Sequence, residues 1–273
     1  MKKQFTLFAA TALAAMTVVP TIGFADDSAS KTPITYDSKG TVEFVAPTTP
    51  NKPLDPTNPD PNKPLDPKDP DGNDPKPGTA GPLSLDFASS FDFGKQEITT
   101  VDKTYNASAQ MIGTGKDAKY VPDYAQITDN RGTFAGWTLS VKETDSFHTS
   151  SNVELKATQI KFADLNHATT NSLKTDVTMP SSGFTLNPAG ASVNIMSGAK
   201  AADGKTNGTS GTHIIRFGND NSLKADTQAN GEKRDNTVDP SVTLAVPGSS
   251  DKMAQKYTTT LQWTLGETPT TID

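Results

Sequence analysis

The chain has no cysteine among its 273 residues, so it can form no disulfide and offers no thiolate as a nucleophile or metal ligand. Without disulfides the stability has to come from a hydrophobic core, and a folded part of about 190 residues is large enough to build one. No segment sustains a helical pattern of apolar residues beyond two turns, which argues against helical bundles and parallel α/β folds.

Residues that commonly carry chemistry are also scarce. The three histidines, His148, His167 and His213, lie far apart in the sequence, and none has a carboxylate or second histidine at metal-ligand spacing. No nucleophile elbow or phosphate-binding loop occurs. Acidic residues are plentiful, but nothing marks two of them as a glycosidase pair. The sequence therefore predicts no catalytic residue, no cofactor and no metal site, and a protein that is not an enzyme.

Positive charge is not concentrated anywhere along the chain. Its 25 Lys and Arg stand against 31 Asp and Glu, which gives a formal net charge of −6. Because there is no basic stripe to hold phosphates, nucleic acid is not expected as a partner. After the first 25 residues no apolar run is long enough to span a membrane.

The first residues have the pattern of a secretory signal peptide. Lys2 and Lys3 precede an apolar run, residues 5–19, that is too short to cross a bilayer comfortably. Gly23 and Ala25 occupy the small-residue positions of a cleavage site. We expect cleavage after Ala25 and a mature chain outside the cell. A secreted chain without disulfides favours a bacterium that exports proteins without oxidative folding.

Residues 47–80 are rich in proline and aspartate. The phrase "NKPLDPTNPDP" is followed directly by "NKPLDPKDPDG", and prolines recur at every third residue, the period of polyproline II. Interspersed Asp and Lys should keep such a segment in water, so it is predicted to be a disordered or polyproline-type linker that acts as a spacer. A docking site for a proline-reading domain is the alternative.

Two interpretations remain open for residues 26–46, which precede this linker. In "TVEFVA", residues 41–46, Val42 and Phe44 share one face of a possible strand. This segment is either the first strand of the main domain or a short N-terminal arm outside it.

From residue 81 to residue 273 the chain reads as short strands separated by turns rich in Gly, Asn, Asp, Pro and Ser. This pattern predicts an all-β domain, an antiparallel β-sandwich of the immunoglobulin-like or a related type. The predicted strands are residues 83–87, 108–112, 124–129, 136–141, 153–162, 192–196, 213–217, 242–246 and 257–265.

Both tryptophans of the chain occur in the same three-residue phrase. The first is Trp137-Thr138-Leu139, and the second is Trp263-Thr264-Leu265. In each phrase the Trp and the Leu lie on one face of a strand, and such a face most often fills a core. The other interpretation is that the rings are exposed and stack on sugars.

The stretch "DNRG", Asp129, Asn130, Arg131 and Gly132, has the composition of a tight turn. It is predicted to connect two antiparallel strands, residues 124–128 and 136–141, as a hairpin. Arg131 has no evident duty in such a turn. It is interpreted as a solvated charge or as a clamp on a carboxylate of a ligand, which makes the turn a possible contact site.

With "GPLSLDFASSFDFG", "YAQITDNRGTFAGWTLSV" and the terminal "YTTTLQWTLGETP", the chain resembles the WxL-domain surface proteins of Gram-positive bacteria over nearly its whole mature length. The two defining phrases map onto the six residues of the two Trp-Thr-Leu phrases. The resemblance implies that residues 81–273 are a WxL-type domain that attaches the protein non-covalently to peptidoglycan, with those six residues as its wall-binding motif. It also implies complexes with other wall-associated surface proteins, and roles in adhesion to host matrix proteins or in stress tolerance.

Two other functions stay open on the sequence alone. One is a scaffold that binds partner proteins and never touches glycan. The other is a secreted carbohydrate-binding module of a glycan-active system. Binding to protein-free peptidoglycan separates the scaffold from the wall-binding protein.

Overall fold

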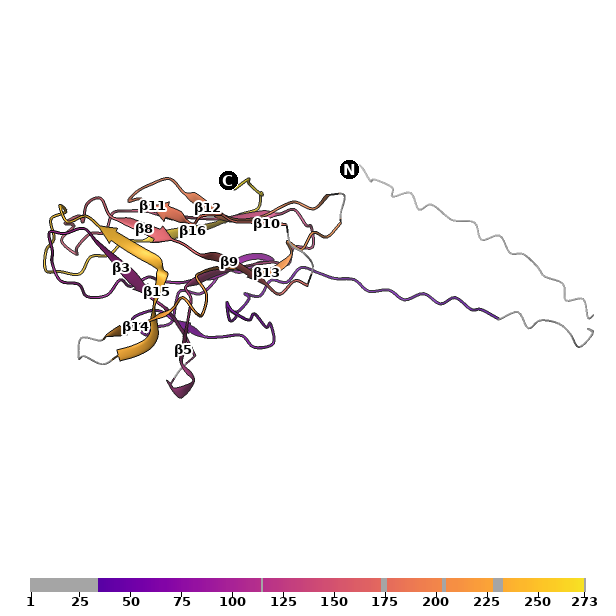
Figure 1. Ribbon diagram of the computed structural model, residues 1–273. Helices are drawn as coiled ribbons and strands as arrows, with labels where there is room; N and C mark the ends of the chain where they lie inside the picture. Colours follow the sequence, from indigo (N-terminus) through magenta and orange to yellow (C-terminus); the bar gives the residue numbers. More distant parts are fainter. Residues whose placement is uncertain (1–33, 114, 173–175, 203–204, 228–232, 273) are drawn as a thin grey trace, which may run out of the picture. The chain divides into compact units, whose positions relative to one another are not determined.

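A computed structural model describes residues 34–113, 115–172, 176–202, 205–227 and 233–272 (Figure 1). The signal peptide predicted for residues 1–25 lies outside these residues. The chain divides into two compact units, residues 1–44 and 45–273. In the described part of the first unit no helix or strand forms, and the side chains of Ile34, Tyr36, Val42 and Phe44 are exposed. Residues 41–46 are therefore not a strand.

The described structure is all β apart from one short 3-10 turn, η1 (Gly115–Asp117). The strands form four separate antiparallel sheets, arranged as the blades of a small four-bladed β-propeller. The all-β prediction is confirmed, but the predicted β-sandwich is wrong. Alternating apolar residues specify that each strand has a buried face. They do not specify how many sheets the strands divide into, because that depends on pairing between distant segments.

Two of the sheets have four strands each. The first has the order β2 (Leu83–Ala88), β6 (Tyr124–Asp129), β13 (Gly211–Phe217) and β9 (Leu165–Thr169). The second has the order β10 (Val177–Thr178), β12 (Val193–Gly198), β7 (Trp137–Glu143) and β16 (Leu261–Gly266). Neighbours in both sheets come from segments far apart in the sequence.

The remaining two sheets are smaller or more irregular. One contains β11 (Phe184–Leu186), β8 (Gln159–Phe162), β15 (Lys233–Val246) and β14 (Lys224–Thr227), with β3 (Lys103–Ser108) also paired to β15. β15 is the longest strand and bends along its length (Figure 1). The last sheet contains β1 (Pro67–Lys68), β4 (Gln110–Ile112) and β5 (Lys119–Val121).

The main hydrophobic core lies where three sheets meet. Trp137, Leu139 and Val141 of β7 enter it from one sheet. Ala125 and Ile127 of β6 enter from the β2–β6–β13–β9 sheet, and residues of β8 and β15 enter from a third. Because these residues alternate along their strands, each sheet presents one apolar face to the same core.

A second core covers the opposite face of the β2–β6–β13–β9 sheet. Tyr124 and Ile214 point into it, and Leu54 of the proline-rich segment closes it with 4% of its surface exposed. Both faces of this sheet are therefore buried, which explains why every residue of β6 is buried.

The proline-rich segment thus differs from the solvated spacer that its composition predicts. The Leu54 N–H donates to Oε1 of Gln126 at 2.8 Å, and Nδ2 of Asn51 donates to Oγ of Ser84 at 3.0 Å. Further along, β1 pairs with β4. The period of three keeps the segment extended, but its "PLDP" phrases also carry a leucine, and burying Leu54 offsets the entropy of ordering the chain.

Candidate functional site

Trp137, the first residue of β7, is completely buried. Its indole N–H donates to the carbonyl of Thr209 at 2.8 Å, which satisfies the one polar group of the ring. Gly198 of β12 lies directly opposite Trp137, and a Cβ on that glycine would lie 2.7 Å from the indole. The ring therefore occupies the space that the missing side chain leaves. Trp137 fills the core and cannot stack on a sugar.

The second phrase lies on β16, which pairs with β7 in antiparallel register. Leu265 is opposite Leu139, and Trp263 is opposite Val141. Residues directly opposite each other in antiparallel strands share a face of the sheet, so both phrases point into the same core. Each Trp precedes its Leu by two residues, so the two phrases are related by a local two-fold axis through the Leu139–Leu265 pair. The register thus places the two tryptophans on the same face of the sheet, on opposite sides of the Leu139–Leu265 pair.

The middle threonines point to the other face of this sheet. Oγ1 of Thr138 accepts from the Thr270 N–H at 2.9 Å and donates to the Thr268 carbonyl at 2.8 Å. This residue therefore fastens the segment after β16 to the sheet. Thr264 is exposed. Of the six predicted motif residues, Trp137 and Leu139 are fully buried and Thr138 nearly so, while Trp263 and Leu265 are partly buried.

The "DNRG" stretch does not form the predicted hairpin. β6 and β7 belong to different sheets, so Asp129 to Gly132 lie in a crossover between blades. The side chain of Arg131 binds both carboxylate oxygens of Asp129, at 2.9 Å from Nε and 2.8 Å from Nη2. Nη2 also donates to the Gly136 carbonyl at 2.7 Å. Arg131 is thus neither solvated nor available as a clamp, since a carboxylate of its own chain holds the guanidinium.

Two of the three histidines, which the sequence leaves unconnected, lie side by side. Nε2 of His167 is 3.0 Å from Nδ1 of His213, and Nε2 of His213 is 3.2 Å from the Ser210 carbonyl. Because that carbonyl can only accept, His213 donates from Nε2 and accepts from His167 at Nδ1. Burial, followed by the neighbouring His167, lowers the pKa of His213 to about 4, and burial lowers the pKa of His167 as well. Both rings are therefore neutral at physiological pH.

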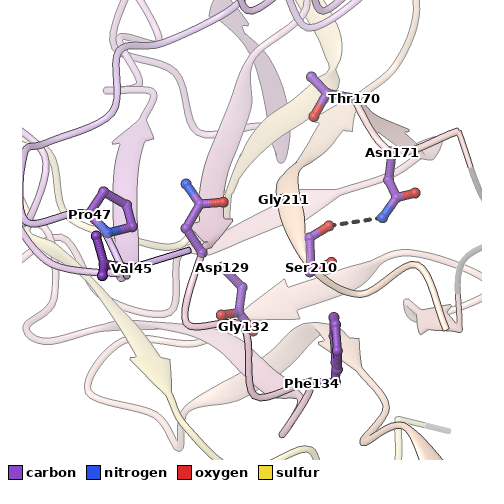
Figure 2. A pocket seen from close by; sticks show the side chains of 10 residues that line it. Val45, Pro47, Asp129, Gly132, Phe134, Thr170, Asn171, Ser210 and Gly211 are labelled. Atoms are coloured by element: carbon purple, nitrogen blue, oxygen red, sulfur yellow. Dashed lines mark hydrogen bonds between the residues drawn. The ribbon is translucent and has the colours of Figure 1, made fainter. Parts of the chain in front are cut away.

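An open groove of about 520 Å³ lies beside this crossover (Figure 2). Its walls come from the loop after β6, the residues that follow β9 and the start of β13, with Val45 and Pro47 at one side. Phe134 presents a half-buried ring at the edge of the groove, and Asn130 and Asn171 contribute amides. Asp129 is the only charged residue of the lining, and Arg131 neutralises it. The groove therefore combines an aromatic ring with neutral polar groups.

Buried residues hold this groove in place. Trp137 binds the carbonyl of Thr209, and His213 binds the carbonyl of Ser210, so both fix the backbone that lines the groove. Phe134 has a φ of 52°, a conformation that is unfavourable for a residue with a side chain. Such strain is often found at functional sites.

Among the groove residues that were not predicted from the sequence are Phe134, Thr170, Asn171 and Ser210. One signal was available for Phe134, because an aromatic residue between Gly132 and Gly136 stands in a loop with little else to bury it. The other three are unremarkable polar residues that reach the groove only through the pairing of β9 with β13.

Among the described residues no group of three or more His, Cys, Asp or Glu side chains is placed to hold a metal ion. The same residues include no helix long and apolar enough to cross a membrane. A protein-family model described as "WxL domain surface cell wall-binding" matches residues 31–269. No curated protein and no solved structure matches the chain.

Proposed function

Since the chain belongs to the WxL family of surface, cell wall-binding domains, we propose that it attaches to the cell wall non-covalently through the groove between β6, β9 and β13. The ligand that this groove fits is the glycan of peptidoglycan. The apolar face of a sugar ring packs well on an aromatic side chain such as Phe134, and amides such as Asn130 match sugar hydroxyls.

Because the groove has no unpaired charge, it favours a glycan over a charged peptide as its ligand. A charged peptide stem would be recognised by unpaired side chains of opposite sign, and Asp129, the charged residue of the lining, is already paired with Arg131. Trp137 then acts indirectly, because it positions the Thr209–Ser210 backbone and does not touch the wall.

Purified cell-wall sacculi, stripped of protein, test this proposal. We expect Phe134→Leu and Asn130→Ala each to weaken binding by about tenfold, the effect of losing one well-placed contact. Asn194→Ala is the matched control, because Asn194 is exposed on the outer face of β12. Binding that survives both groove variants and is lost in the control would place the contact on that outer face instead. Circular dichroism establishes that each variant is folded.

The same assay separates the two remaining functions. A scaffold that recognises only partner proteins would not bind protein-free sacculi. A carbohydrate-binding module of a glycan-active system would bind soluble glycans as well as it binds sacculi. We propose no catalytic role, since the sequence marks no two acidic residues as a catalytic pair and the one carboxylate of the groove, Asp129, is bound by Arg131.

We also propose that the N-terminal arm contacts other surface proteins or host matrix proteins, which would give the protein a role in adhesion. The described arm, residues 34–44, exposes Ile34, Tyr36, Val42 and Phe44. Exposed apolar residues in a segment without secondary structure are typical of chains that fold on a partner. Removing residues 34–44 should leave binding to sacculi unchanged and reduce capture of surface proteins from wall extracts. Unreduced capture would assign the partners to the folded unit.

A further inference from the structure

Two aspartates that are distant in the sequence meet inside the folded unit. Asp123 lies in the loop between β5 and β6, and Asp239 lies on β15, 116 residues later. Both are completely buried. The Asp123 N–H donates to Oδ2 of Asp239 at 3.0 Å, so the two residues are immediate neighbours.

The burial of the Asp123 carboxyl group is poorly compensated. Neither of its oxygens makes a hydrogen bond with the described residues. The Ser89 hydroxyl accepts a hydrogen bond from the Tyr124 N–H and can donate its own hydrogen to Asp123, but this one neutral donor offsets less than burial and the charge of Asp239 cost. None of the four ion pairs in the described part of the chain involves Asp123 or Asp239. Two buried carboxyl groups without a cation are costly, and folded proteins usually pair or ligate such groups.

A second observation concerns Gly218, at the end of β13. A Cβ on this residue would lie 2.5 Å from Oγ of Ser222, 2.5 Å from Oγ of Ser241 and 3.3 Å from Oδ1 of Asp239. Three side-chain oxygens thus lie close together against the backbone of Gly218. The Ser241 hydroxyl is buried and has no hydrogen-bond partner among the described residues. Two neighbouring buried carboxyl groups with few hydrogen-bond donors around them, one of them next to the buried Ser241 hydroxyl, are suited to a partner that takes oxygen ligands.

We propose that Asp123 and Asp239, with the Ser241 hydroxyl, bind a calcium ion between β15 and the loop that precedes β6. Calcium is the cation that fits, because it takes oxygen ligands in irregular geometry, whereas zinc and copper sites use nitrogen or sulfur. The remaining ligands would be backbone carbonyls and water. A wall-binding domain works where calcium is abundant, and extracellular calcium modules need only weak affinity.

Without a cation, the charged forms of the two carboxyl groups are costly to bury. Burial, followed by the negative charge of Asp239, raises the pKa of Asp123 well above its usual value. Burial also raises the pKa of Asp239 to about 6. A bound cation would reverse both shifts by stabilising the charged carboxylates. It would also tie two blades together, since the Phe217 N–H of β13 donates to the Asp123 carbonyl at 2.8 Å.

The mature chain, residues 26–273, tests the site in two ways. Terbium, which occupies calcium sites, should luminesce when the neighbouring Tyr124 is excited, and added calcium should quench that signal by displacement. Millimolar calcium should raise Tm by about 3 to 10 °C relative to chelator, the shift expected for a weak site near saturation. Magnesium should do much less, because it requires a regular octahedron.

Asp123→Asn should remove both responses without lowering Tm in chelator, because it replaces an unpaired carboxyl by a neutral group of the same shape. Asp251→Asn, at an exposed aspartate, is the matched control and should keep both responses. Ser241→Ala serves as a second variant and should weaken terbium binding several-fold. A wild-type chain with no calcium-dependent Tm and no terbium signal would overturn the proposal, as would responses that persist in Asp123→Asn. If the pair shared a proton instead, Tm would depend on pH and not on calcium.

Discussion

At the scale of single residues, the two tryptophans differ in their burial and contacts. That of Trp137 is buried against the Thr209 carbonyl, whereas Trp263 keeps part of its surface in water. Trp137 therefore couples the core to the backbone of the groove, and Trp263 contributes apolar contact to the same core. This difference predicts that the two respond differently to the same substitution.

Trp137→Phe should destabilise the protein by about 2 to 4 kcal/mol, because it leaves a cavity and an unpaired buried carbonyl. It should also weaken binding to sacculi, since the Ser210 backbone loses its support. Trp263→Phe is the matched control and should cost about 1 kcal/mol or less, because part of its ring is in contact with water. Thermal melts and sacculus binding of both variants check this. Equal losses would contradict the positioning role of Trp137.

The buried carboxyl group of Glu143, at the end of β7, should make the stability of the protein depend on pH. It is buried and neither carboxyl oxygen has a hydrogen-bond partner among the described residues. Burial raises its pKa from 4.5 to about 7. The folded state therefore keeps a proton that the unfolded state releases between these values, so this residue makes stability fall as pH rises from about 4.5 to about 7.

Glu143→Gln should remove that dependence, which amounts to about 3 kcal/mol across the window. The measurement is the difference between the unfolding free energies of wild type and variant at several pH values. Taking the difference matters because His213 acts in the opposite direction, its lowered pKa making stability fall as pH falls. Glu97→Gln, at an exposed site, should give a flat difference curve. A flat curve for Glu143→Gln would show that the carboxyl reaches water.

At the scale of elements, β7 depends on its two neighbours in different ways. On one side, Gly198 of β12 makes room for the indole of Trp137. On the other side, Gly266 of β16 lies opposite Thr138, and a Cβ there would meet nothing closer than a carbonyl oxygen at 3.8 Å. Two glycines that flank the same strand therefore have opposite tolerance for a side chain.

Gly198→Ala should destabilise the sheet by about 1 to 3 kcal/mol, since a Cβ at 2.7 Å from a buried ring forces the ring or the strand to move. Gly266→Ala should change the free energy of unfolding by about 0.5 kcal/mol or less. Chemical denaturation of both variants distinguishes them. A neutral Gly198→Ala would show that the indole can shift without cost.

At the scale of the whole molecule, the compact unit begins at Val45, before the proline-rich segment. Within this segment, Leu54 covers the second core. The Leu54 N–H donates to Oε1 of Gln126, and Nε2 of Gln126 donates to the Lys52 carbonyl. Asp55 adds an ion pair with Lys119. The domain boundary that the sequence suggests at Gly81 would leave the face of Tyr124 and Ile214 open to water.

A chain truncated to residues 81–273 should therefore lose at least the contribution of one buried leucine, about 2 to 5 kcal/mol, relative to residues 45–273. Residues 45–273 should match the mature chain in both Tm and binding to sacculi. Leu54→Ala in the mature chain reproduces the loss of the buried leucine alone. A fragment 81–273 as stable as 45–273 would show that the proline-rich segment only rests on the domain.

The local features of this protein can be predicted from its amino-acid sequence. Alternation of apolar residues identifies β2, β6, β7, β12, β13 and β16, because the period of two in a strand depends only on residues that are close in the sequence. The two Trp-Thr-Leu phrases, together with the motifs around them, also identify the family, as the match over residues 31–269 confirms.

The division of these strands among sheets, and the contacts between distant residues, can be seen only in the tertiary structure. The division into four sheets, the crossover at Asp129 and the Leu139–Leu265 pair depend on contacts between residues that are far apart in the chain. The same holds for the groove at Phe134, the histidine pair and the buried aspartates. A period of two specifies which side chains are buried. It says nothing about which distant strand buries them, because many pairings of short antiparallel strands satisfy the same pattern.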